Sequence, residues 1–154
     1  INSFGVTVLG RRLAREKALQ ILFQIDVGKI RPEKALQYTL EEENLSKDVK
    51  DFATALVLGT LEHMEKVDKL IAQHSRDWPL YRIANVDRNI LRLAVFELLC
   101  VPDIPHTVTI NEAIELAKIF SGEGAGAFVN GILDQIWRHI QEEGKVQNTD
   151  GGQQ

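Results

Sequence analysis

Apolar residues recur along the chain with the spacing of amphipathic helices. Between Leu13 and Val27 they fall at i, i+4, i+7, i+8 and i+11, which predicts a first helix that ends at Gly28. Pro32 then stands where a first helical turn tolerates its missing N–H group. We expect a second helix from this proline to about Glu43.

Ser46 is a good N-cap for a third, long helix that we expect to continue to about Gln73, with a kink near Gly59. The segment that follows, SRDWPLYRIAN at 75–85, contains proline and aromatic residues and breaks the helical pattern. This segment is the best candidate for a hinge between two halves of the chain.

The second half shows the same helical spacing in three further stretches. The first is Val86–Val101, which the sequence PDIP stops. Thr109 and Glu112 have capping-box spacing and predict the start of the next helix, before a break at Ser121–Gly126. A last helix is expected over 127–141. No stretch alternates as a strand would, so we predict an all-α fold of about seven helices.

Length and composition are those of one globular domain of 154 residues, with 44% hydrophobic residues. No apolar run approaches the roughly 20 residues that would cross a bilayer, so no membrane association is expected. Cys100 is the only cysteine, which excludes an internal disulfide and favours a cytoplasmic location. We expect residues 1–10 to be a flexible leader and residues 142–154 a disordered tail.

Candidate catalytic chemistry is sparse. The four histidines have no ligand-like spacing to one another or to Cys100. The sequence SGEGAG at 121–126 lacks the Gly-Lys-Ser/Thr ending of a phosphate loop, and no nucleophile motif is present. We therefore expect no enzymatic activity, no metal and no cofactor.

Positive charge is concentrated near the start of the chain. Residues 1–29 carry five basic and two acidic side chains, a net charge of +3. The whole chain has a net charge of -4, so the remainder carries -7. Such a split indicates a local anion-binding face on a body that otherwise repels polyanions, although a solvated helix end is the simpler explanation.

A helical wheel at about 100° per residue places Arg12, Arg15 and Phe23 together, away from the apolar stripe of the first helix. The helix at Val86–Val101 has a similar layout, with Arg88, Arg92 and Phe96 opposite its apolar stripe. Arginines beside an exposed aromatic ring suit single-stranded RNA, because they neutralise phosphates while the ring stacks on a base. The alternative is that both phenylalanines pack against neighbouring helices.

Three blocks of sequence resemble the NusB family of bacterial transcription antitermination factors. They are RRLAREKALQILFQ at 11–24, VDRNILRLAVFELL at 86–99 and IPHTVTINEAIELAKIFSGEGAGAFVNGILD at 104–134. The resemblance covers Arg11 to about Ile140 and implies a helical bundle of two subdomains, at about 11–77 and 78–141.

The resemblance also implies partners and site residues. The partners are single-stranded boxA RNA of rRNA operon transcripts, the small-subunit ribosomal protein NusE as a heterodimer partner, and the RNA polymerase antitermination complex. By motif, the implied RNA contacts are Arg11, Arg12, Arg15, Phe23, Asp87, Arg92 and Phe128. Two departures from the family pattern are Gly124-Ala125-Gly126, where some members have an acidic residue, and Phe23, where a tyrosine would add a hydroxyl.

Two alternatives remain beside an RNA-binding antitermination factor. One is a NusB-like RNA-binding domain of an rRNA cytosine methyltransferase, against which we expect no room for a catalytic domain after Gln141. The other is a helical protein-interaction module whose arginine face pairs with an acidic partner. Salt-dependent RNA binding, compared with binding to NusE alone, distinguishes these classes.

Overall fold

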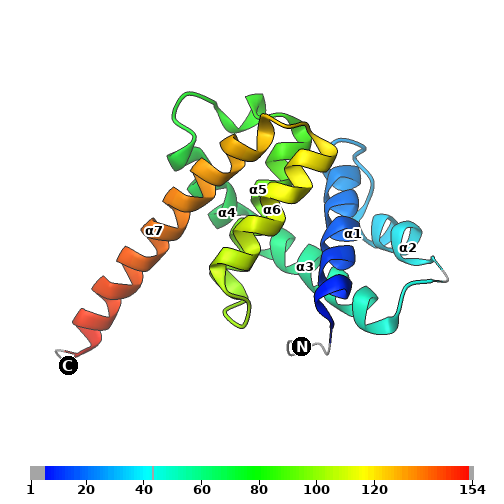
Figure 1. Cartoon of the computed structure of the whole chain (residues 1–154), viewed down its shortest axis with the longest axis horizontal. Helices are drawn as coiled ribbons and strands as arrows, with labels where there is room; N and C mark the ends of the chain where they lie inside the picture. Colours follow the sequence, from blue (N-terminus) through cyan, green and yellow to red (C-terminus); the bar gives the residue numbers. More distant parts are fainter. Residues whose placement is uncertain (1–5, 43, 153–154) are drawn as a thin grey trace.

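The computed structural model describes residues 6–42 and 44–152, and over these it forms seven α-helices and one 3-10 helix, without a strand (Figure 1). In chain order they are α1 (Val8–Asp26), α2 (Pro32–Leu40), α3 (Lys47–Glu62), α4 (Met64–His74), η1 (Leu80–Arg82), α5 (Asn85–Cys100), α6 (His106–Phe120) and α7 (Ala125–Gly152). The predicted all-α fold is confirmed. No helix of the described residues is long and apolar enough to span a bilayer.

The first helix begins earlier than the apolar pattern predicts. Thr7 caps it, because its hydroxyl oxygen accepts a hydrogen bond from the backbone N–H of Gly10 at 3.0 Å. Val6 is buried in the core, with 2% of its surface exposed. The expected flexible leader is therefore wrong for residues 6–10, and its residues 1–5 lie outside the described part of the chain.

The long helix predicted to run from Ser46 to about Gln73 is two helices. Ser46 caps α3 as predicted, but the chain breaks at His63, between α3 and α4, and not at Gly59. Gly59 has a different role, since a Cβ atom at this position would collide with the ring of Phe96. The glycine therefore permits close packing of α3 against α5.

Helix boundaries also differ from the prediction in the second half. α6 begins at His106, directly after Pro105, so the proposed capping box is wrong. The Thr109 hydroxyl instead donates a hydrogen bond to the buried carboxylate of Glu97 at 3.4 Å. α7 continues beyond the expected end at 141 through most of the expected tail, because helix propagation adds one hydrogen bond per residue once a helix exists.

α5 is the central helix of the molecule. It packs against α1, α3 and α4 from the first half and against α6 and α7 from the second (Figure 1). Buried apolar residues from both halves form one continuous core around it. The division into two subdomains stays a prediction, since α5 contacts helices on both sides of the expected boundary.

Candidate nucleic-acid interface

Arg12 lies on the exposed side of α1 and is held by Glu112 of α6. Its Nη2 atom donates to Oε1 of Glu112 at 2.8 Å and its Nε atom donates to Oε2 at 3.0 Å. The hydrogen bond from Arg12 lowers the pKa of the Glu112 carboxyl below its ordinary value, even though burial opposes this shift. The Arg12 side chain stays 49% exposed, so it can still meet a ligand from solvent.

Arg15 is placed differently from the prediction. Its side chain is only 3% exposed and forms an ion pair with the 2% exposed Glu97 of α5, at 2.7 Å between Nη2 and Oε1. A second donor, Nε, contacts both carboxylate oxygens of Glu97 at 3.0 and 3.1 Å. The expectation that Arg15 shares an exposed face with Phe23 is wrong, because Arg15 is paired inside the core with Glu97, which is 82 positions away in the sequence.

Arg11 is the arginine of this cluster that forms no ion pair with a carboxylate of the described residues, although Glu112 is near enough to feel its charge. Its Nε atom is buried and has no hydrogen-bond partner, while the side chain as a whole is partly exposed. An unpaired guanidinium beside the half-exposed Arg12 provides positive charge that a phosphate can use. The first turns of α1 therefore present two arginines, and not the three expected from the sequence.

Phe23 lies in an apolar surface groove between the C-terminal ends of α1 and α6. The groove has a volume of about 370 Å³ and is lined by Leu19, Gln20, Phe23, Gln24, Val86 and Phe120. Phe120 is 41% exposed, and Phe23 is partly exposed rather than part of the buried core. The predicted exposure of the Phe23 ring agrees with this position.

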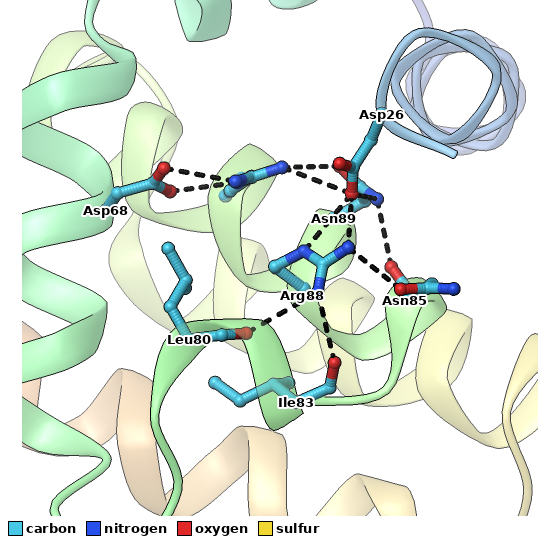
Figure 2. Close-up of polar contacts among 8 residues, drawn as sticks. Asp26, Asp68, Leu80, Ile83, Asn85, Arg88 and Asn89 are labelled. Atoms are coloured by element: carbon cyan, nitrogen blue, oxygen red, sulfur yellow. Dashed lines mark hydrogen bonds and ion pairs between the residues drawn. The ribbon is translucent and has the colours of Figure 1, made fainter. Parts of the chain in front are cut away.

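The arginines of α5 are neutralised by carboxylates of the first half (Figure 2). Arg88 donates to Oδ2 of Asp26 through Nη2 at 2.7 Å and through Nε at 3.1 Å, and Asn89 donates to the same oxygen at 3.0 Å. Burial raises the pKa of Asp26, but the hydrogen bonds from Arg88 and Asn89 outweigh it and leave this pKa below its ordinary value. Asp26 therefore stays ionised at neutral pH and fixes the end of α1 to α5.

The second basic-aromatic face predicted from the helical wheel is wrong. Arg92 is 12% exposed and donates hydrogen bonds to Asp68 of α4 at 2.8 and 3.0 Å. Its Nη1 atom also lies 3.3 Å from Oδ2 of Asp26. Phe96 is 8% exposed and packs over Gly59. The polar and aromatic side of α5 faces other helices, and Arg92 is a structural ion-pair residue in this conformation.

The two remaining predicted residues lie at helix N-termini. Asp87, in the first turn of α5, is 8% exposed, and its Oδ1 atom is buried without a hydrogen-bond partner. Phe128, in the first turn of α7, is partly buried and packs against the core. Neither residue therefore presents an exposed polar group: the unpaired oxygen of Asp87 is buried, and Phe128 makes a packing contact.

The structure adds residues that sequence analysis did not assign to the interface, among them Glu112, Val86 and Phe120. Glu112 was interpreted as a cap, and nothing in its local sequence indicates Arg12, which is 100 residues away. Phe120 carried a signal, since a large apolar residue at the end of a helix, beside a glycine-rich loop, has little core to pack into. Within the described residues no cluster of His, Cys, Asp and Glu could hold a metal ion.

Comparisons with known proteins identify the family of this chain. A model of the NusB family matches residues 12–138. The chain belongs to the NusB family. It is 50% identical over 138 residues to the transcription antitermination protein NusB of Desulforamulus reducens, which covers 90% of this chain and 96% of that protein. It is also 50% identical over 132 residues to the protein of that name from Bacillus subtilis, at 86% and 98% coverage.

Solved structures of NusB proteins have the same fold. T. maritima NusB superimposes with a TM-score of 0.79 at 42% identity, covering 83% of this chain and 90% of that chain. A chain from the crystal structure of antitermination factors NusB and NusE in complex with double-stranded RNA gives a TM-score of 0.80 at 30% identity, with 86% and 99% coverage. The family expected from the three sequence blocks is therefore confirmed.

Proposed function

We propose that the chain is a non-enzymatic, RNA-binding transcription antitermination factor. It binds single-stranded boxA-type RNA of rRNA operon transcripts together with NusE, in the cytoplasm, as part of the RNA polymerase antitermination complex. The names of the curated relatives support the antitermination role, and the crystal structure of NusB and NusE with double-stranded RNA supports RNA binding together with NusE. The relatives are matched over nearly their full length, which favours an antitermination factor over a domain of an rRNA methyltransferase.

The observation that carries the proposal is the apolar groove at Phe23. It is a surface hollow with two partly exposed phenylalanines, and it lies on the same helix as Arg11 and Arg12. Arg12 and Phe23 are eleven positions apart, which is about 16 Å along an α-helix. A single strand can therefore place phosphates at the arginines and a base in the groove, a combination that binds RNA without reading a duplex.

The roles we propose follow from these positions. Arg11 and Arg12 bind phosphate, and Phe23 stacks on a base, with Phe120 closing the other side of the groove. Asp87 lies at the edge of this surface, in the first turn of α5, and its buried Oδ1 atom does not reach an RNA base in this conformation. Arg15, Arg92 and Phe128 support the surface from behind, through the contacts described above.

The experiment is a titration of labelled boxA-type RNA against the protein and its Phe23→Ala variant, with thermal melting of both. We expect the variant to lose about 1–3 kcal/mol of RNA binding and little stability, because the ring is a stacking platform. Phe23→Leu keeps an apolar side chain without a ring and should show a similar RNA defect.

A different result would point to a core residue. If Phe23→Ala costs about 3–5 kcal/mol of folding free energy and leaves RNA affinity intact, the ring belongs to the fold and the groove is not the RNA site. RNA of scrambled sequence serves as the specificity control. Equal affinity for both RNAs would contradict recognition of a boxA-type element.

A further inference from the structure

A second exposed aromatic surface lies outside the groove, in the linker between α4 and α5. We call it the linker surface and define it by Arg76, Trp78, Tyr81 and Arg82. Trp78 is 52% exposed and Tyr81 is 75% exposed, although rings of this size are normally more buried. The antitermination site as described above does not use any of these four residues.

The linker surface also carries positive charge that the fold leaves unpaired. Arg12, Arg15, Arg88 and Arg92 each have a carboxylate partner at 2.7–2.8 Å. Arg76 and Arg82 have no such partner among the described residues, and the Arg82 guanidinium lies 5.9 Å from the centre of the Tyr81 ring. Asp77 is the one acidic side chain of the segment, so its net charge is modest and stacking must supply most of any binding energy.

The linker is held in place rather than loosely attached. Arg88 of α5 donates from Nη1 to the carbonyl oxygens of Ile83 at 3.3 Å and Leu80 at 3.5 Å (Figure 2). Backbone hydrogen bonds of 2.8 Å, from Trp78 to Ser75 and from Arg82 to Pro79, close two turns within it. The aromatic rings are thus presented on a fixed backbone, which lowers the entropic cost of ordering the linker when a ligand binds.

The same Arg88 side chain connects this linker to the RNA groove. Arg88 also binds Asp26, the last residue of α1, and the linker enters α5 at Asn85, one residue before Val86, which lines the groove. The linker and the C-terminal ends of α1 and α6 lie at the same end of the molecule (Figure 1). A strand that leaves the groove past the N-terminus of α5 would run toward this linker.

We propose that the linker surface binds nucleotides of the same RNA strand that flank the element held in the groove. This inference rests on the proposed RNA-binding function and extends its site. Trp78 and Tyr81 stack on unpaired bases, while Arg76 and Arg82 neutralise the adjacent phosphates. Because stacking tolerates any base, this contact increases affinity and footprint length without adding sequence specificity.

The test compares a boxA-type RNA with the same RNA extended by about eight unpaired nucleotides on either side, a length within the usual site sizes of single-strand binders. The chain has two tryptophans, so Trp137→Phe leaves Trp78 as the only tryptophan, whose fluorescence can be excited apart from that of the two tyrosines. We expect one of the extended RNAs to bind at least about fivefold more tightly than the short RNA, and to quench Trp78. Melting of the Trp137→Phe variant confirms that it is folded.

The double variant Trp78→Ala and Tyr81→Ala should lose the advantage of the extended RNA and keep the affinity for the short RNA. The matched control is Tyr38→Ala, which removes a 61% exposed ring from α2. This variant should change neither the affinity for the short RNA nor the advantage of the extended RNA. The charge contribution is tested by Arg76→Gln with Arg82→Gln, which should flatten the salt dependence for the extended RNA only. Arg31→Gln, at an 82% exposed arginine of the α2 region, is the control.

Three results would contradict the proposal, and they differ in whether the proposed function fails with it. If the short RNA binds but neither extension strengthens binding or quenches Trp78, the linker proposal fails and the proposed function stands. If the double variant weakens binding of NusE and not of RNA, the linker surface is a protein interface and the proposal is equally wrong. If no boxA-type RNA of either length binds, with or without NusE, the proposed function fails and this inference with it.

Discussion

At the scale of single residues, each arginine is distinguished by the carboxylate it meets. Arg15 and Glu97 are both buried, so their charges are satisfied within the fold. Arg12 and Glu112 form an equally short contact, but Arg12 is half exposed and an incoming phosphate can compete for it. Identical side chains three positions apart on one helix thus have different roles, set by what the partner helix presents.

The Arg12–Glu112 pair should lower the affinity for RNA, because Glu112 competes with phosphate for Arg12. Glu112→Gln removes the competing charge, so we expect RNA affinity to rise a few fold and the salt dependence to steepen by about 0.7, the value for one added phosphate contact on a single strand. Salt titrations of labelled RNA measure both quantities. Glu115→Gln makes the same change in net charge at an exposed position of α6 and should have a smaller effect. Equal effects of the two variants would mean that only net charge matters.

The Arg15–Glu97 pair should matter for folding and not directly for RNA. Arg15→Met alone leaves the Glu97 carboxylate buried without its partner, which should cost about 3–5 kcal/mol of unfolding free energy. Adding Glu97→Leu should recover most of this loss, because a well-packed apolar pair can replace a buried ion pair. Denaturant unfolding gives the stabilities. A recovered double variant with strongly weakened RNA binding would instead show that Arg15 contacts RNA directly.

At the scale of helices, the sequence predicts most elements well and misjudges the environment of α5. Its boundaries were predicted to within a residue, because apolar periodicity and the PDIP stop are local signals. The burial of Arg88, Arg92 and Phe96 was missed, because it depends on Asp26, Asp68 and Gly59 from other helices. These contacts join residues 24 and 62 positions apart, and no helical wheel contains that information.

We predict opposite effects on stability when alanine replaces two of the helical glycines. Gly59→Ala places a methyl group into the Phe96 ring and should destabilise the protein by about 1–3 kcal/mol through overpacking. Gly131→Ala meets no atom within 4 Å, so it should stabilise the protein by about 0.5–1 kcal/mol through helix propensity. Thermal melting of the two variants side by side is the check. Similar changes in both would contradict the close approach of α3 and α5.

At the scale of the whole molecule, charge limits how strongly the protein binds RNA alone. The chain has a net charge of -4, and most of the arginines expected to face RNA are paired with carboxylates. Few phosphates can be neutralised by what remains, so unaided affinity at physiological salt should be modest. A partner with its own RNA-contacting surface would join two weak contacts into one footprint.

The most direct test of the central claim is therefore the affinity for boxA-type RNA with and without saturating NusE. We predict that NusE raises RNA affinity at physiological salt, and that RNA tightens the protein complex by the same factor, as linkage requires. Both arms can be measured by titration of labelled RNA and labelled NusE. Equal RNA affinity in the presence and absence of NusE would contradict joint binding and leave a stand-alone RNA-binding protein.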